Sequence, residues 1–483
     1  MIRNRPSNRW LRQPSGSIAW VLLVLFAGEP ARAQTLDEAL AQAYETNPQL
    51  QGARAGLRAT DEGVPAARAT RHPSLMVSGQ GGKEDVTQLL PAGSTPVVQP
   101  LATLAQSAYD SWTASISQPI YLGGRSTAQV AAALLTVDAG RAQLAASEAV
   151  VLFQVASSYL GSLRDEEVLS LTGESEARLQ DELAAVDTQL QASVATLPDK
   201  LQVDTQLANA TAARLLALGA VQVSHDAFLR AVGHAPDHLT LPKLRPDLPA
   251  SRDEALNLAA TNNPGVIAAG ALRDAGYKTI TTVSGRLLPE VSVIGSYTRY
   301  YNWPVGGINQ GTMTDRAIQL QVVWPLFDGG ATYAETRQAK ENFTQLQQTA
   351  RDARAAALQQ TGQAWDTLEA ARGALRELTR AVGVAHQAYE GVREQQLLGS
   401  RTVTDVLVAE QALLQTEINQ TTSRYTALIA EFALAQQLGT LTAAALNLHV
   451  PRYDPTEHFE DVQNRWIGLG PHVTQGASQG PNR

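Results

Sequence analysis

Few residues in this 483-residue sequence have the types and spacing that chemistry at a site requires. The sequence contains neither a GxxxxGK[ST] phosphate-binding loop nor an HExxH zinc motif. It has no cysteine, which excludes disulfides, thiolate metal sites, thiol catalysis and a lipid-modified N-terminal cysteine. His234 and His238 have the spacing of paired helix ligands, but Pro236 would break the helix that aligns them. We therefore expect no enzymatic activity, no cofactor and no metal site.

Charged and hydroxyl residues gather instead at two short stretches, 193–199 and 399–405, each lying between two long helical patterns. The residues concerned are Arg401, Asp199, Asp405, Thr402 and Thr196. One interpretation is ordinary helix capping, with Asp199 and Asp405 as N-caps, because polar side chains at a helix start satisfy its free N–H groups. Any further role depends on the elements that carry these residues.

Composition limits the classes of protein to consider. The net charge is −8 and charged residues make up 17% of the chain, which argues against a nucleic-acid partner, because such a partner requires a basic face. Aromatic residues make up only 5%, so a large compact core is not expected.

The N-terminus predicts export from the cytoplasm. Residues 1–17 are rich in arginine and lack acids, residues 18–27 are apolar, and an Ala-Arg-Ala cleavage pattern precedes Gln34. These are the parts of a secretory signal peptide. No later apolar run approaches the roughly 20 residues of a membrane-spanning helix, so a mature chain that crosses a membrane is expected to use strands.

The chain is predicted to contain two copies of one unit. TLDEALAQAYETNP, starting at Thr35, matches SRDEALNLAATNNP, starting at Ser251 (251 − 35 = 216). Pro73 matches Pro289 at the same offset (289 − 73 = 216). Such conservation of spacing indicates internal repetition.

The offset then changes once. Pro119 matches Pro325 at an offset of 206 (325 − 119 = 206), and this value holds to the end of both copies. The first copy therefore has ten more residues (216 − 206 = 10) between its first and second strands. We expect them in an exposed loop near 84–108, with residues 302–315 beside it.

Each copy has the same expected elements: a helix of about 35 residues, two strands, a helix of about 67 residues, a turn and a helix of about 34 residues. The expected helices span 36–70, 126–192 and 199–232, then 253–284, 332–398 and 405–438. At about 1.5 Å per residue, the two shorter helices laid end to end match the long one. This predicts a rod with strands at one end and turns at the other.

The elements divide the chain into six parts. They are a signal peptide (1–33), a first repeat (34–233), an equatorial segment (234–251), a second repeat (252–439), an equatorial C-terminal segment (440–470) and a disordered tail (471–483). The two equatorial segments contain Pro, Gly and short extended runs, so they should form a collar near mid-length.

The strands alternate apolar and polar residues. In the last strand, Ile318, Leu320 and Val322 share one face and Gln319 and Gln321 the other. This pattern is typical of a transmembrane barrel, although a soluble two-layer sheet would also show it. Strand edges cannot stay unpaired in lipid, and the smallest barrels have about eight strands. With four strands per chain, three chains supply the smallest open barrel, of twelve strands.

Each second strand leads directly into a long helix, at QPIYLGG (118–124) and WPLFDGG (324–330). Glycine adopts backbone angles that other residues rarely adopt, so a glycine pair lets a strand become a helix without a linker. The predicted strand-to-helix transition comprises Pro119, Gly123, Gly124, Pro325, Gly329 and Gly330.

These features resemble the TolC-type outer-membrane exit ducts, most of all those of type I secretion. The resemblance covers about residues 35–467 and rests on the order and duplication of TLDEAL…NP, QPIYLGG, WPLFDGG and GSRTVTDVLVAEQALL. It implies an α+β membrane protein: a homotrimer whose twelve-stranded transmembrane β-barrel, with four strands per chain, is continuous with a long periplasmic α-helical barrel. It also implies contact with outer-membrane lipid in a Gram-negative cell, extension into the periplasm, and docking to a periplasmic adaptor and an inner-membrane transporter.

The C-terminal YDPTEHFEDVQNRWIG (453–468) resembles the tail of members that export polypeptides with an ABC transporter. Drug-efflux members often carry an N-terminal lipid-modified cysteine, which is absent here. Type I secretion is thus favoured over multidrug efflux with a proton-driven pump. A secreted coiled-coil structural or adhesive protein is an alternative from another class.

The resemblance also gives the turn residues a role as a periplasmic gate. In the family, the Arg of GSRT holds the entrance closed by pairing with an acid on the neighbouring hairpin; by motif alignment these are Arg401 and Asp199. Asp405 matches an acid in a ring that attracts cations. The family's second ring acid falls at Val408 and its tyrosine clamp at Gln396, so a single acidic ring and a weaker latch are expected.

Overall fold

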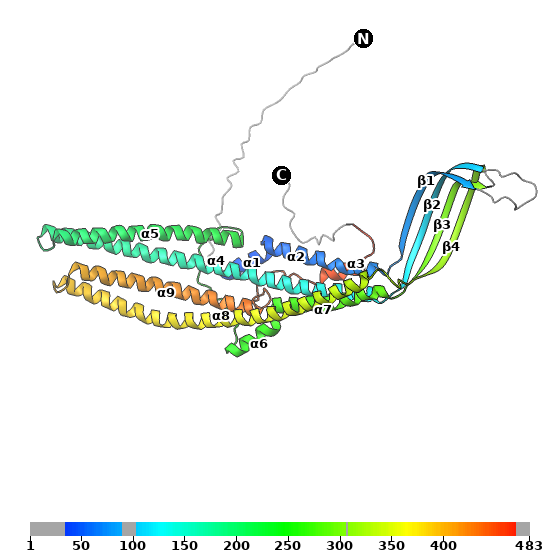
Figure 1. Cartoon of the computed structure of the whole chain (residues 1–483). Coiled ribbons are helices and arrows are strands. Elements are labelled where there is room, and N and C mark those ends of the chain that lie inside the picture. The colour runs from blue at the N-terminus through cyan, green and yellow to red at the C-terminus, as the bar shows by residue number, and fades with distance from the viewer. Residues whose placement is uncertain (1–33, 89–102, 306–307, 470–483) are drawn as a thin grey trace, which may run out of the picture.

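The computed structural model describes residues 34–88, 103–305 and 308–469 and forms a long rod (Figure 1). Two helices of 67 residues run along it, α4 (Arg125–Gln191) and α8 (Ala331–Leu397). Two helices of 36 residues, α5 (Leu197–Val232) and α9 (Val403–Leu438), turn back along them as hairpins. The strands lie at the end opposite the turns, as the sequence predicts. The predicted signal peptide and C-terminal tail lie outside the described residues.

The first helix of each repeat is not continuous, which corrects the prediction. The first repeat has α1 (Leu36–Thr46), α2 (Pro48–Asp61) and α3 (Gly63–Ala69); the second has α6 (Arg252–Asn262), α7 (Pro264–Ser284) and the 3-10 turn η1 (Gly285–Leu287). Proline disfavours the helical conformation at the residue before it, and Asn47 is extended, with ψ 123°. Asn47 then caps α2, accepting hydrogen bonds from the backbone N–H groups of Gln49 and Leu50. Asn263 does the same for α7.

The four strands form one antiparallel sheet in the order β1-β2-β3-β4. They are β1 (Ser74–Gln88), β2 (Thr103–Leu122), β3 (Glu290–Val305) and β4 (Ile308–Val323). The strands are longer than predicted: residues 84–88, 103–108 and most of 302–315 are strand and not loop. Backbone pairing continues past the apolar alternation, because ladder hydrogen bonds do not depend on side-chain type. The central part of the predicted long loop, 89–102, lies outside the described residues.

The register aligns the apolar positions of all four strands on one face. Leu75 pairs with Ile116, Ile116 with Gly295, and Gly295 with Ile318. On the other face Thr113 pairs with Thr298, and their hydroxyls are 3.1 Å apart. The apolar face is open, since 87% of Ile318 is exposed. An exposed apolar face of this kind suits contact with lipid.

The largest core lies at mid-length. Tyr159 of α4 is fully buried there, and its hydroxyl is 2.6 Å from the carbonyl oxygen of Thr240 and 2.9 Å from that of Gln34. Leu441 and Leu446 belong to the same cluster. The segments that follow α5 and α9 are thus packed against the long helices.

Helices α4 and α5 are long and apolar enough, by length and composition, to cross a membrane, which differs from the expectation that no later segment approaches that length. They pack against each other, and α4 also packs against α7 and α9. Small apolar side chains also serve close helix packing, so composition alone does not separate the two roles.

Candidate functional site

The strand-to-helix junctions are fixed by backbone conformation. Gly123 and Gly124 have φ of 61° and 73°, and Gly329 and Gly330 have φ of 70° and 88°. Gly124 and Gly330 are the N-caps of α4 and α8. Left-handed backbone is readily available only to glycine, so the glycine pairs allow each sharp change of direction.

The two prolines act differently. Pro119 lies within β2, where the register with β3 shifts between Pro119 and Tyr121. Proline has no N–H to donate to the ladder, so it fits such an irregularity. Pro325 follows the end of β4 at Val323.

The junctions also differ in how tightly they are packed. A Cβ at Gly123 would overlap the carbonyl oxygen of Gly285, whereas nothing lies within 4 Å of a Cβ at Gly329. The second junction is held by Asp328, which accepts hydrogen bonds from the N–H of Gly330 at 3.1 Å and of Thr332 at 2.8 Å, and from the Thr332 hydroxyl. These bonds hold the pKa of Asp328 below its usual value.

At the opposite end, both turns lead into capping boxes. Thr196 Oγ1 donates to Asp199 Oδ2 at 2.6 Å, and the Thr196 N–H donates to the same oxygen at 2.9 Å. Thr402 and Asp405 repeat the arrangement at 2.9 and 3.0 Å. The threonines are the N-caps and the aspartates are the third helical residues, which corrects the expectation that the aspartates would be N-caps.

These bonds to threonine lower the pKa of both Asp199 and Asp405. The positive end of the helix dipole also favours a negative charge at the helix start. The capping interpretation therefore has a geometric basis within one chain.

Arg401 is exposed and donates from Nε to Gln395 Oε1 at 3.2 Å. Its charge also helps to lower the pKa of Asp405. Within the described part of one chain, Arg401 has no contact with Asp199; the predicted latch joins neighbouring hairpins and stays a prediction. The two hairpins do touch near the turns, where Thr404 Oγ1 donates to Gln202 Oε1 at 2.8 Å.

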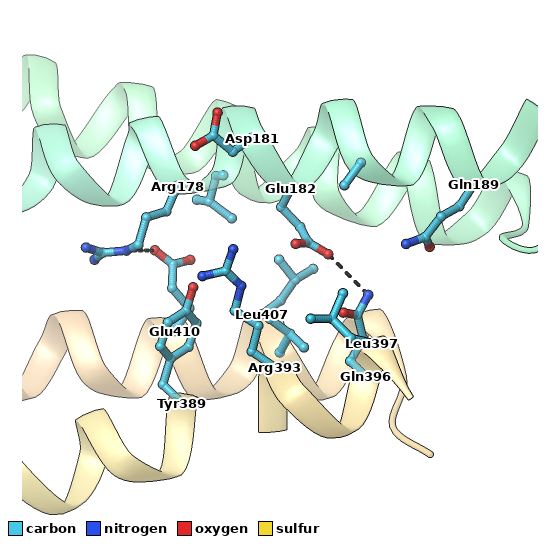
Figure 2. A pocket seen from close by; sticks show the side chains of 13 residues that line it. Arg178, Asp181, Glu182, Gln189, Tyr389, Arg393, Gln396, Leu397, Leu407 and Glu410 are labelled. Carbon is cyan, nitrogen blue, oxygen red and sulfur yellow. Dashed lines mark hydrogen bonds and ion pairs between the residues drawn. The ribbon is translucent and has the colours of Figure 1, made fainter. Parts of the chain in front are cut away.

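A charged cluster lies between the hairpins, along the helices that lead to the turns (Figure 2). It surrounds a cavity of about 170 Å³ between α4, α8 and α9. Glu410 of α9 is only 3% exposed and accepts hydrogen bonds from Ser175 Oγ at 2.7 Å and Arg178 Nε at 3.4 Å. Burial of an ionised group is tolerated when it is paired in this way.

A hydrogen bond between Gln396 of α8 and Glu182 of α4 also links the hairpins in this cluster. Gln396 Nε2 donates to Glu182 Oε1 at 3.5 Å, and Arg393 points toward the cavity (Figure 2). Burial raises the pKa of Glu182, and Arg393 partly opposes this shift. Gln396, at the position of the family's tyrosine clamp, therefore still reaches α4, whereas Val408, at that of the second ring acid, is exposed.

This cluster was not predicted from the sequence. Arg-x-x-Asp/Glu spacing along a long helix indicates a solvated face, but Arg178 donates to the buried Glu410. The available signal was the position of Glu410 on the buried stripe of α9, together with Val406, Leu407 and Leu413. A carboxylate at apolar spacing needs a partner on the facing helix.

The outer membrane efflux protein family model matches residues 39–234 and 255–440. The chain belongs to the outer membrane efflux protein family. It is accordingly an outer-membrane channel protein that reaches into the periplasm and carries out transport without catalysis. The resemblance seen in the sequence is thereby confirmed.

Three curated members of the family match nearly end to end. The outer membrane efflux protein BepC of Brucella suis biovar 1 is 28% identical over 448 residues, covering 92% of this chain and 94% of BepC. TolC of Vibrio cholerae is 24% identical, covering 85% of this chain and 92% of TolC. The alkaline protease secretion protein AprF of Pseudomonas aeruginosa is 25% identical, covering 88% of each chain.

Solved structures of the family share the fold. The Campylobacter jejuni CmeC outer membrane channel superposes with a TM-score of 0.74 at 13% identity, covering 95% of this chain and 98% of CmeC. VceC of Vibrio cholerae gives 0.71 at 19% identity, covering 84% and 96%. At this identity the likeness concerns the fold alone.

Proposed function

We propose that three copies of this efflux-family chain form one duct with a twelve-stranded barrel in the outer membrane. The observation that carries this proposal is the open four-stranded sheet, whose edge strands β1 and β4 lie at opposite ends of the order and whose apolar face is exposed. Unpaired backbone edges are too costly in lipid, so the strands of other copies must complete the sheet. Three copies give twelve strands (3 × 4) and leave room for an open lumen.

The hairpins α4–α5 and α8–α9 would continue this wall as a periplasmic helical barrel. Residues 1–33 would be the cleaved signal peptide, and 234–251 with 440–470 would form an equatorial collar. Cleavage before Gln34 is tested by sequencing the N-terminus of the mature protein.

The turns would form the periplasmic entrance. In this proposal Arg401 of one hairpin pairs with Asp199 of the neighbouring one, and Asp405 from each chain contributes to an acidic ring. The capping hydroxyls of Thr196 and Thr402 fix the two carboxylates on the helix starts, so their charges have defined positions. Exposed pairs are worth only about 0–1 kcal/mol each, but three copies acting together can shift a two-state equilibrium by a few kcal/mol.

The proposed cargo is a polypeptide, delivered by an inner-membrane ABC transporter through a periplasmic adaptor, as in type I secretion. Two observations support this choice: the C-terminal segment 453–468 resembles that of secretion members, and AprF is named for secretion of alkaline protease. Multidrug efflux with a proton-driven pump is the second candidate, favoured by the name of BepC, an efflux protein.

Deletion of the gene separates the two candidates. Type I secretion predicts that one or a few polypeptides disappear from the culture medium while drug susceptibility is unchanged. Efflux predicts the reverse pattern, with increased susceptibility and an unchanged set of secreted polypeptides. Restoration by the plasmid-borne gene controls for effects on neighbouring genes.

A further inference from the structure

The C-terminal segment is fastened along the first helices of the chain. The backbone N–H of Tyr453 donates to the hydroxyl of Tyr44 at 3.1 Å, and the Arg54 guanidinium lies 4.5 and 5.0 Å from the centres of these two rings. His458 of α10 (Glu457–Val462) lies 3.1 Å from the buried carboxylate of Asp61 on α2. Figure 1 shows this red segment beside α2 and α3.

The fastening continues toward the strands. Arg68 of α3 donates to the carbonyl oxygen of Gln463 at 2.7 Å and to the side-chain oxygen of Asn464 at 2.6 Å. Trp466 then stacks on His72, with ring centres 3.9 Å apart and planes inclined by 22°. His72 lies two residues before the start of β1 at Ser74 (74 − 72 = 2), so Trp466 is placed at the helix–strand junction.

The described part of this segment ends in apolar residues that the other described residues leave exposed. Trp466 is 64% exposed, Ile467 is 89% exposed and Leu469 is fully exposed. We call these three residues the C-terminal apolar tip. Three exposed apolar side chains within four residues are unfavourable in water.

Two features of the surroundings point to a lipid surface. First, the tip adjoins the apolar face of the sheet, whose first exposed residue on β1, Leu75, follows His72 by three positions (75 − 72 = 3). Second, Arg68 contacts the segment at Gln463 and Asn464, and Arg465 precedes Trp466. Residues 63–74 contain no acid, and the acids of the segment lie further back, on and before α10. Tryptophan beside basic residues at the edge of an apolar band is typical of the membrane interface, where anionic headgroups meet acyl chains.

We propose that the C-terminal apolar tip inserts into the periplasmic leaflet of the outer membrane, at the level of the phospholipid headgroups. This inference rests on the proposed function, because it assumes that the sheet spans the membrane. The contacts of Arg68 and Asp61 would hold the tip in place, so the end of the C-terminal segment would be attached to the lipid surface beside the barrel.

The test is fluorescence quenching in proteoliposomes of phosphatidylethanolamine and phosphatidylglycerol, with bromine on the acyl chains close to the glycerol backbone. The full chain is compared with Trp466→Phe, Trp112→Phe and Trp365→Phe, and each difference gives the emission of one tryptophan. Trp112 lies on the apolar face of β2 and reports the barrel; Trp365 lies in α8, away from the sheet. We expect brominated lipid to reduce the emission of Trp466 and Trp112 but not that of Trp365.

The outcomes separate the two proposals. Quenching of Trp112 without Trp466 overturns the tip insertion and leaves the barrel intact; quenching of neither overturns the barrel as well. Quenching of Trp466 by aqueous iodide alone would place the tip in water. Protection of Trp466 from both agents would place it under protein, either another copy or residues 470–483, and would also overturn the inference.

Discussion

The two ends of the rod each redirect the chain twice, but they use different interactions. At the strand end, the direction changes through pairs of glycines with positive φ. At the turn end, each turn has a single described residue with positive φ, Ser193 or Gly399, and the next helix begins in a capping box whose threonine is exposed. The backbone geometry of the first has few alternatives, whereas the contacts of the second are individually weak.

This difference indicates which end can move. A junction that only glycine can form, and that continues the wall of a membrane barrel, suits a permanent structure. Turns whose capping contacts are exposed and worth about 1 kcal/mol suit an entrance with more than one state. Buried contact between the hairpins begins directly beyond the turns, in a cluster that includes Val186, Val203 and Val403, and continues at the buried Glu410.

The largest effect should come from the strand end. Gly123→Ala should lower the free energy of unfolding by roughly 2–3 kcal/mol, because it adds a left-handed backbone penalty to an overlap with the Gly285 carbonyl. Gly329→Ala, with open space around its Cβ, should cost only the backbone penalty of about 1 kcal/mol. Unfolding of the detergent-solubilised protein measures both, with Gly219→Ala in α5 as a helix control. Equal costs at Gly123 and Gly329 would refute the packing difference.

A smaller effect is expected in the buried cluster. Arg178→Met leaves the Glu410 carboxylate with Ser175 as its remaining described partner, which should cost roughly 1–3 kcal/mol. Arg380→Met is the matched control, since Arg380 also lies on a long helix but its side chain is 81% exposed. Glu410→Gln added to Arg178→Met should recover part of the loss, because the buried charge is gone. If the two arginine variants unfold alike, the cluster does not hold the hairpins.

Substitutions of the turn residues should lower the free energy of unfolding less than substitutions in the buried cluster do. They should change the conductance of the channel more. Thr402→Ala should cost about 1 kcal/mol as a lost N-cap. Arg401→Glu should open the entrance by repelling Asp199, and Asp405→Ala should lower cation selectivity. Single-channel recording in planar bilayers measures conductance and reversal potential, and Asp405→Asn separates charge from capping. Unchanged conductance in Arg401→Glu and unchanged reversal potential in Asp405→Ala would leave these residues as ordinary caps.

The smallest effect is the response to mild acid. Burial raises the pKa of Glu182, so the folded state binds its proton more tightly than the unfolded state, and the hairpin contact should strengthen as pH falls toward 4.5, the ordinary value for Glu. Asp199 and Asp405 have lowered pKa values, so their contribution is present above 3.8 and is lost only below it. Protection factors for hydrogen exchange in α8 and α9, which correct for the lower intrinsic exchange rate in acid, should therefore rise in mild acid. Glu182→Gln should reduce this rise, and protection factors that fall in mild acid would contradict this assignment.

The long helices and the strand-to-helix order could be predicted because their periodicity and repeat offset are local properties of the sequence. The breaks at Asn47 and Asn263 were not predicted, since helical spacing continues on both sides of a break of one residue. The Asn-Pro pairs were the available signal, because proline disfavours helix at the residue before it and asparagine is a favoured N-cap. The loops predicted to begin at 84 and 302 begin later, because β1 continues to Gln88 and β3 to Val305. Apolar alternation alone does not show how far backbone pairing extends.

The turn residues could be found from sequence because they interrupt long helices. Their capping bonds follow the Thr-x-x-Asp spacing. The Glu410 cluster and the stacking of Trp466 could not be found in this way. Glu410 and Arg178 are 232 positions apart (410 − 178 = 232), and Trp466 and His72 are 394 positions apart (466 − 72 = 394). No local pattern identifies which distant helix faces such a residue.

The central claim is that one chain supplies a third of a membrane channel, and the mass of the assembly tests it most directly. Native mass spectrometry of the protein extracted from outer membranes in detergent should give three copies of the mature chain, in a complex that persists after removal of excess detergent. A stable, folded monomer carrying the four-stranded sheet in detergent would contradict the account.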